Sequence, residues 1–411
     1  MASPLLGKLQ SGKHKSLFES NPFFAVYSTG FDTLDAINAF KMDYMGKDGN
    51  IHSDVVKGLI GGRFVTIVGT SGTGKSTLAD QIAWNIVKPF KNGLMMHVDA
   101  EQTVLDQRLY QTIGVDINNE DDISRIIINK DATYVEDILM VVNDICAAKE
   151  VLGKDAMYEV DGKWWGLKKV WVYEPTVIII DALPSFVSKN TDTTAVDGQM
   201  TTNREVAVVA QFYTKLLAKM NKYNITIIAT NHIRPKIVVD VYNAPPPQLM
   251  ILKQSETLPR GQAPIYYAST IFRLNAAGRS SMFTEDEYGF EGFECVAQAA
   301  KSKTAYIGGS CRMIFRDDRG FDKSYTLLAT AYDNNLVEGR NPYLYMTGKP
   351  EYKFSRKEFG KKYETDPEFK AAIDEVLQPV LVHKIESKIQ SADRLPNADK
   401  NVDLTKEIAA E

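Results

Sequence analysis

Short runs of apolar residues alternate along the middle of the chain with longer segments whose apolar residues recur at helical spacing. The runs have the length of strands and cover residues 64–68, 94–98, 177–180 and 225–230. Unbroken apolar runs suit strands that are covered on both faces, as in a parallel sheet. The intervening pattern indicates helices over residues 76–87 and 204–221. This alternation predicts a doubly wound α/β core, with a mainly parallel sheet flanked by helices.

The segments around this core divide the chain further. Residues before about 30 are polar and then aromatic, and rings such as Phe23 and Phe24 must pack either on an adjacent subunit or on their own domain. Residues 265–330 are rich in strand signals and are expected to extend the sheet. The predicted units are an assembly arm at 1–30, a core at 31–338 with an insertion or loop at 40–58, a small basic and aromatic C-terminal domain at 339–384, and a flexible polar tail at 385–411.

Composition narrows the class of protein. A length of 411 residues suggests about two to three domains. With 44% hydrophobic and 24% charged residues, the chain is not disordered throughout. It has no apolar run near the roughly 18 residues of a membrane span, and its start lacks the apolar stretch of a signal peptide. Cys146, Cys295 and Cys311 are far apart and form neither a disulfide framework nor a zinc knuckle. We therefore expect a cytoplasmic protein without a membrane partner.

A glycine-rich motif, GTSGTGKS, directly follows the first apolar run and precedes a predicted helix. It matches the phosphate-binding loop G-x-x-x-x-G-K-[ST] in the structural context that the motif requires. Glycines let backbone N–H groups surround phosphates, Lys75 supplies a charge to the β- and γ-phosphates, and the Ser76 hydroxyl can bind Mg²⁺. The residues predicted to hold the phosphates are Gly69, Thr70, Ser71, Gly72, Thr73, Gly74, Lys75, Ser76 and Thr77.

Polar residues at the ends of three further strands complete a predicted site for ATP and Mg²⁺. Asp181 follows the run 177–180 and can organise Mg²⁺, but Ala182 comes next, so a hydrolytic base must come from elsewhere. Glu101, after the run 94–98, is the candidate base; the alternative is a solvated strand-end carboxylate. His232 follows the run 225–230 and either senses the γ-phosphate or is an ordinary strand-end histidine.

The order of these motifs resembles the ATPase core of RecA-family recombinases. GTSGTGKS, VDAE, VIIIDALPS and IIATNHIR occur in that family's order, and residues 27–35 (YSTGFDTLD) are similar to the segment that leads into its core. The histidine at position 232 is typical of the phage branch represented by UvsX, where bacterial RecA has glutamine. The resemblance covers most of residues 15–383, and a phage origin would place the protein in the cytoplasm of a bacterial host.

The resemblance implies roles for particular residues. Glu101 would polarise the attacking water, and His232 would couple the γ-phosphate to the loop that follows it. Lys301 and Lys303, in the segment AKSK, would reach across a subunit interface to a neighbour's ATP and stabilise transition-state charge. Lysines two apart on a strand share one face; the alternative is a solvated edge strand. Tyr110 and Arg108 are the candidates for packing on adenine, because the spacing from Glu101 to the next glycine is one residue longer than is usual in the family.

In this family, the loops after the Asp181 and His232 strands hold single-stranded DNA. Here they would be residues 188–203 and 235–262, and the second has only three basic against two acidic residues. Its alternative is a plain flexible connection. The net charge of the whole chain is −4, so DNA affinity would have to accumulate along a filament. The predicted DNA-binding residues are Lys189, Arg204, Lys236, Lys253 and Arg260; the basic stretch 349–362 is either a duplex contact or a solvated helix face.

These patterns predict an ATP-dependent recombinase that forms helical filaments on single-stranded DNA and pairs it with homologous duplex DNA. Single-strand-binding and mediator proteins are possible partners. Two alternatives remain: a helicase or DNA-packaging motor of the same superfamily, which would form a closed ring, and a non-catalytic, ATP-switched scaffold or recombination mediator. A small-molecule kinase is disfavoured, because no arginine-rich lid follows the nucleotide site.

Overall fold

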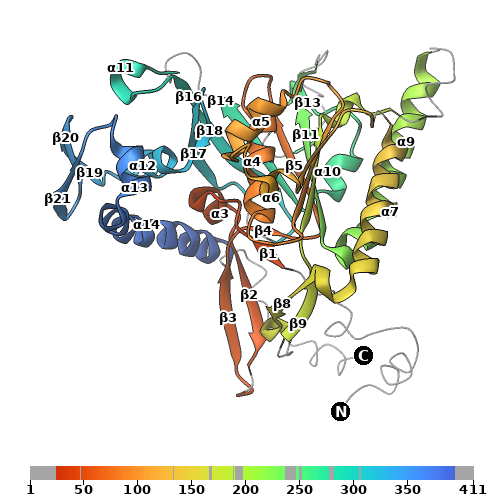
Figure 1. Ribbon diagram of the computed structural model, residues 1–411, viewed down its shortest axis with the longest axis horizontal. Coiled ribbons are helices and arrows are strands. Elements are labelled where there is room, and N and C mark those ends of the chain that lie inside the picture. Colours follow the sequence, from red (N-terminus) through yellow and green to blue (C-terminus); the bar gives the residue numbers. More distant parts are fainter. Residues whose placement is uncertain are drawn as a thin grey trace, which may run out of the picture.

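A ten-stranded sheet forms the centre of the protein in the computed structural model (Figure 1). The described residues are 25–46, 48–132, 134–165, 169–187, 189, 198–236, 247–249, 252–276, 282–304 and 307–393. The strands of the sheet are β5 (Phe64–Gly69), β6 (Leu94–Asp99), β7 (Ile126–Asn129), β10 (Thr176–Asp181), β11 (Ile225–His232), β14 (Thr270–Ala276), β15 (Met282–Phe283), β16 (Gly292–Ser302), β17 (Ser310–Arg316) and β18 (Gly320–Asp322). Their order is β18-β17-β16-β14-β5-β11-β10-β6-β7, with β15 beside β16.

Strand direction divides this sheet into two parts. The strands β14, β5, β11, β10, β6 and β7 are all parallel to their neighbours in this group. The strands β15, β16, β17 and β18 pair antiparallel and continue the sheet on the β14 side. The predicted α/β class with a mainly parallel sheet is therefore confirmed, and so is its extension by residues 265–330.

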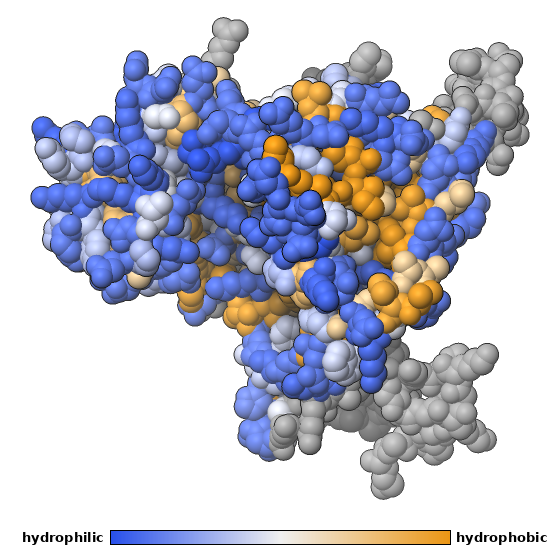
Figure 2. Space-filling model, in the orientation of Figure 1, coloured by the Kyte–Doolittle hydropathy of each residue, from blue (hydrophilic) through white to orange (hydrophobic). Residues whose placement is uncertain are grey.

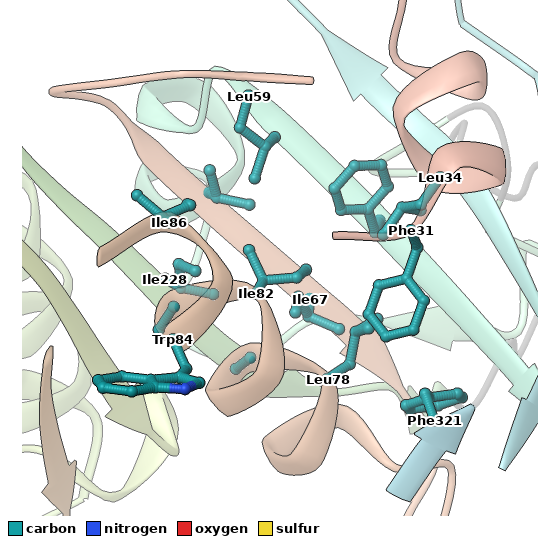
Figure 3. Packing of buried hydrophobic residues seen from close by; sticks show 14 of the residues in the cluster. Phe31, Leu34, Leu59, Ile67, Leu78, Ile82, Trp84, Ile86, Ile228 and Phe321 are labelled. Carbon is teal, nitrogen blue, oxygen red and sulfur yellow. The ribbon is translucent and has the colours of Figure 1, made fainter. Parts of the chain in front are cut away.

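Side chains that alternate along the parallel strands pack on two separate helical layers. Val177 and Ile179 of β10 face α4, whereas Ile178 and Ile180 face α7 and α9. Figure 3 shows the first layer, where Ile82 of α4 lies near Ile67 of β5. Burial on both faces explains why these strands appear in the sequence as unbroken apolar runs. The helices of the core are α3 (Asp32–Ile37), α4 (Lys75–Val87), α5 (Asp106–Ile113), α6 (Glu120–Ile123), α7 (Val135–Leu152), α9 (Gly198–Tyr223) and α10 (Ala263–Tyr267).

Two hairpins project from one end of the core, at the bottom of Figure 1. They are formed by β2 (Phe40–Met45) with β3 (Ile51–Val56), and by β8 (Met157–Asp161) with β9 (Lys169–Tyr173). The expectation of a loop at 40–58 is corrected here, because most of that segment is a β-hairpin. The Asp54 carboxylate of β3 accepts a hydrogen bond from the Trp164 indole (2.6 Å) and pairs with Lys163 (2.7 Å). Residues distant in sequence therefore support the inserted hairpin.

Short ribbons and 3-10 turns connect the larger elements. The ribbons are β1 (Val26–Tyr27) with β4 (Leu59–Ile60), and β12 (Arg234–Pro235) with β13 (Glu256–Thr257); the turns are η1 (Gly153–Ala156), η2 (Lys163–Trp165) and η3 (Leu183–Ser185). The Tyr27 side chain in β1 is buried against its own core, where its hydroxyl accepts a hydrogen bond from the Asn224 amide (2.5 Å). Phe23 and Phe24 of the predicted arm lie outside the described residues.

A second hydrophobic core lies at the left of Figure 1, beyond β17. Its elements are α11 (Glu285–Tyr288), α12 (Lys323–Asp333), β19 (Val337–Arg340), β20 (Tyr343–Met346), β21 (Lys349–Phe354), α13 (Phe359–Thr365) and α14 (Pro367–Asp393). Helix α14 continues past the domain boundary expected at residue 384, because Ile385 and Ile389 are buried against Ala36 and Ala39 beside α3. This contact joins the C-terminal elements to the core. Within the described residues, no helix is both long and apolar enough to cross a membrane.

Candidate nucleotide-binding and hydrolysis site

The glycine-rich loop connects strand β5 to helix α4, as its motif predicts. Gly72 and Gly74 have φ angles of +74° and +80°, in the left-handed region that favours glycine. A Cβ atom at Gly74 would come within 2.9 Å of the Phe321 ring, so the loop also packs too closely there for any other residue. These features fit a loop that curls around phosphates at the N-terminus of a helix.

Lys75 begins helix α4 and bridges the loop. Its ammonium group donates a hydrogen bond to the carbonyl oxygen of Thr70 at 2.8 Å. Burial lowers the pKa of Lys75, and the Asp181 and Glu101 carboxylates oppose this shift. The lysine is therefore a poorly solvated cation near two acidic groups, which suits binding of a phosphate.

Asp181 lies at the end of β10 and is held from two sides. The Thr230 hydroxyl on β11 donates to one oxygen of the Asp181 carboxylate at 2.5 Å, and the backbone N–H of Ala100 donates to the Asp181 carbonyl at 3.0 Å. Asp181 is also the register partner of Asp99 on β6. The carboxyl ends of these parallel strands thus meet at one edge of the sheet.

Glu101 and His232 lie close together at this same edge. The Nε2 atom of His232 is 3.5 Å from Oε1 of Glu101, and His232 is the register partner of Gly69 in the phosphate loop. Asp99 holds the turn that carries Glu101, because its carboxylate accepts hydrogen bonds from the backbone N–H groups of Thr103 and Val104 (3.2 and 2.8 Å). The structure therefore brings Lys75, Glu101, Asp181 and His232 together.

These residues fit a nucleoside triphosphate and Mg²⁺. Ser76 in the first turn of α4 and Asp181 supply the hard oxygen ligands that Mg²⁺ prefers, while the loop and Lys75 suit the phosphates. When bound, the metal ion would neutralise phosphate charge. Sequence reasoning missed Thr230 and Asp99, although both are in motifs that it used: Thr230 is two residues before His232, and Asp99 is in VDAE.

Lys301 and Lys303, which were predicted to reach a neighbour's ATP, lie near the amino ends of the parallel strands. The phosphate loop and Asp181 lie at the carboxyl ends. Lys301 is the register partner of Ile271, near the start of β14, whereas the phosphate loop begins beside Leu274 at the far end of that strand. The Lys301 ammonium donates to the carbonyl oxygen of Tyr266 (3.0 Å), and the Lys303 ammonium is 5.6 Å from the Tyr266 ring centroid. Burial lowers the pKa of Lys301 to about 8, and repulsion from Lys303 adds to this shift. Within one chain, these lysines do not join the nucleotide site.

The two candidates for contact with adenine have different surroundings. The Tyr110 ring is half-buried and packs against the core cluster around α4. The Arg108 guanidinium instead donates to the carbonyl oxygen of Asp318 (3.4 Å). The turn that carries Asp318 approaches the phosphate loop, since a Cβ at Gly320 would be 2.6 Å from Cγ2 of Thr77. Sequence reasoning missed this turn, whose only signal is RDDRG between two strands.

The predicted DNA-binding residues that the structure describes have different surroundings. Lys189 pairs with Asp137 at the start of α7 (2.7 Å), and the Arg260 guanidinium donates to the carbonyl oxygen of Pro184 (2.6 Å). Lys236 and Lys253 are exposed near the β12–β13 ribbon. The side chain of Arg204 lies outside the described residues, and so do residues 188, 190–197, 237–246, 250 and 251 of the two predicted loops.

Comparison with known proteins agrees with this site at a coarse level. Residues 46–236 match the family model described as an AAA domain. The match includes the phosphate loop, Glu101, Asp181 and His232, and it ends before Lys301. No curated protein matches the chain. The mainly parallel α/β fold and this match agree with a P-loop ATPase domain over residues 46–236.

Proposed function

We propose that this protein is an ATP-dependent recombinase. It forms helical filaments on single-stranded DNA, hydrolyses ATP in response to DNA, and exchanges strands with homologous duplex DNA. The observation that carries the proposal is the separation of Lys301 and Lys303 from the phosphate loop. The two groups occupy opposite edges of one rigid sheet, so the lysines can assist hydrolysis only at another subunit's nucleotide.

This separation favours head-to-tail assembly. When one subunit's lysines meet the next subunit's nucleotide, each chain uses two different surfaces, and such heterologous contacts make open helices or closed rings. The exposed edge strand β7 supplies a further surface for assembly: Ile127 is 40% exposed there, and Figure 2 shows hydrophobic residues gathered between α5 and α7 on the face in view. The predicted arm, with Phe23 and Phe24, is the proposed partner of a neighbouring core.

The position of the loops supports coupling of ATP to DNA. The segments 188–203 and 235–262 follow β10 and β11, whose ends carry Asp181 and His232. Glu101 polarises the attacking water, and its neighbour His232 links the state of the γ-phosphate to the loop that begins just after it. DNA binding in that loop can therefore alter the position of the catalytic glutamate.

Two defective variants, mixed together, test the shared site. Glu101→Gln keeps the lysines but lacks the base, and Lys301→Ala/Lys303→Ala keeps the base but lacks the lysines. In a random equal mixture, about a quarter of the head-to-tail interfaces would combine a complete base with complete lysines. We expect each variant alone to be nearly inactive and the mixture to regain a corresponding part of the DNA-stimulated ATPase activity.

Failure of the mixture to regain activity, with both variants folded and able to bind ATP, would contradict the shared site. A D-loop assay with ATP and a homologous duplex then tests strand exchange itself. A closed ring with directional unwinding would support the helicase or motor. Nucleotide binding without DNA-stimulated turnover would support the scaffold or mediator.

A further inference from the structure

A buried histidine lies beneath the candidate site and has no part in the chemistry described so far. His97 is in β6, and its side chain is completely buried. Along this strand, residues 95, 97 and 99 face α4, as Val177, Ile179 and Asp181 do along β10. The Nδ1 atom of His97 is 2.6 Å from Oδ1 of Asp80, one turn after Ser76 in α4. The imidazole therefore lies between the helix that begins at the phosphate loop and the strand that ends at Asp181.

The other nitrogen of this imidazole faces Asp181. The Nε2 atom of His97 is 3.9 Å from Oδ2 of Asp181 and has no hydrogen-bond partner within the described residues. The opposite oxygen, Oδ1, already accepts the hydrogen bond from Thr230. A shift of about 1 Å would bring Nε2 and Oδ2 within hydrogen-bonding distance. Thr230 and His97 thus approach the two oxygens of one carboxylate from different strands.

Stability alone gives little reason for this arrangement. Replacing a buried ion pair by apolar residues of similar volume is often neutral or stabilising, and the surrounding layer is mainly hydrophobic. Burial raises the pKa of Asp80, and the adjacent histidine opposes this shift. The 2.6 Å contact shares a proton between Asp80 and Nδ1, so the other ring nitrogen can carry a hydrogen and donate it to Asp181.

We propose that His97, held by Asp80, is a positioning residue that orients the Asp181 carboxylate for Mg²⁺-dependent nucleotide binding. The proposal rests on the ATPase function of the site but on no particular DNA partner. Asp80 fixes the ring through Nδ1, the Nε2–H group restrains Oδ2 of Asp181, and Thr230 restrains Oδ1. The carboxylate is then preorganised by groups that touch neither the nucleotide nor the metal.

Two amide substitutions test the roles of the two ring nitrogens of His97 separately. His97→Asn places an amide near Nδ1, which retains a donor to Asp80 and loses the donor to Asp181. His97→Gln places its amide near Nε2 and retains the donor to Asp181. A third variant, Asp80→Leu/His97→Phe, removes both members of the pair and leaves no unpaired buried charge. Ile82→Ala, in the same layer of α4, is the control for loss of core packing alone.

The direct measurement is Mn²⁺ binding to the protein–nucleotide complex, followed by electron paramagnetic resonance, beside nucleotide affinity without metal. Loss of a residue that supports a metal ligand typically weakens metal affinity about 10–100-fold. We expect a loss in this range for His97→Asn and for the double variant, a clearly smaller loss for His97→Gln, and none for Ile82→Ala. Metal-free nucleotide affinity should stay the same in all of them, and the Mg²⁺ dependence of ATPase activity should shift in parallel.

Unchanged Mn²⁺ affinity in His97→Asn would overturn the proposal, as would equal losses in His97→Asn and His97→Gln. If the double variant does not fold, the two single variants still decide the question. Failure of the ATPase assignment is a separate result, because the wild-type protein itself would then show no Mg²⁺-dependent nucleotide binding.

Discussion

Glu101 follows β6 and Asp181 ends the neighbouring strand β10, so the proposed base and the proposed metal ligand come from two different strands. Asp99 holds the turn of Glu101, and Thr230 holds Asp181. Glu101→Gln keeps the size of the side chain and removes its basicity. We expect this variant to bind ATP normally and to hydrolyse it about 10²–10⁴-fold more slowly, the usual contribution of a general base. Steady-state ATPase assays beside nucleotide-binding titrations measure both effects. Normal turnover would mean that the base is another residue.

Lys75 acts through its charge, which burial makes costly without a phosphate nearby. Lys75→Ala removes a cation that interacts electrostatically with Asp181 and Glu101. Hydrogen bonds to charged groups contribute about 1.5–3 kcal/mol each, so ATP affinity should fall by at least about tenfold. Lys88→Ala, at the other end of α4, is the matched control because it removes an exposed lysine from the same helix. Unchanged affinity in Lys75→Ala would contradict the assignment of the site.

At the scale of elements, Lys149 connects α7 to the residue that follows β9 and to the end of α9. Its buried ammonium donates to the carbonyl oxygens of Glu174 (2.7 Å) and of Tyr223 (2.8 Å), the last residue of α9. Burial lowers the pKa of Lys149 to about 7, although the neighbouring Cys146 and Glu174 oppose this shift. The folded protein therefore releases this proton at lower pH than the unfolded chain does.

The sign of this shift gives a test. Between about pH 7 and the ordinary lysine pKa, the unfolded chain binds more protons, so the free energy of unfolding rises with pH. The contribution of one group is about 1 kcal/mol per pH unit in this range, and Lys149→Met should remove it. Denaturant unfolding at pH 7, 8 and 9 measures the free energy of unfolding of both proteins. The value for the wild type minus that for the variant should increase by about 1 kcal/mol per pH unit. A constant difference would mean that the folded state keeps Lys149 charged.

The elements differ in how far the sequence alone predicts them. Strands β5, β6, β10 and β11 are predictable because burial on both faces makes each an unbroken apolar run. The hairpin β2–β3 is not, since its strands lie outside the main sheet and neither of them is an unbroken apolar run. The Asp54 carboxylate of β3 contacts Lys163 and Trp164, and Trp164 is 110 residues further along the chain. Local sequence patterns do not encode such a contact.

The same reason limits what the sequence predicts of the site. Motifs identify Lys75, in the loop and helix that follow β5, and Asp181, at the end of β10, because parallel strands bring their carboxyl ends to one edge. They do not identify Thr230 or His97, whose importance depends on which strand lies beside β10. Nor do they predict that α14 continues over α3, because that contact requires the C-terminal elements to fold back on the core.

For the whole molecule, the balance of charge limits the proposed binding of DNA. The chain has a net charge of −4, and two of the predicted DNA-binding residues already have partners in the protein: Lys189 pairs with Asp137, and Arg260 with the carbonyl oxygen of Pro184. One subunit can therefore neutralise few phosphates. Each phosphate contact to a single strand changes the logarithmic dependence of affinity on salt by about −0.7, so about three contacts would give a slope near −2 per subunit.

Weak contacts by each subunit require many subunits on one strand. We expect affinity in the presence of ATP and Mg²⁺ to be far higher for an oligothymidine of about 60 nucleotides than for one of about 10, because linked sites raise the effective concentration of each neighbour. Fluorescence anisotropy at several salt concentrations measures the length dependence and the slope together. The Lys301→Ala/Lys303→Ala variant should lose much of the length dependence while keeping the weak affinity for the short strand, since its interfaces lack the lysines. Equal affinity for both lengths in the wild-type protein would show that a single subunit is the DNA-binding unit. That result would contradict the proposed filament.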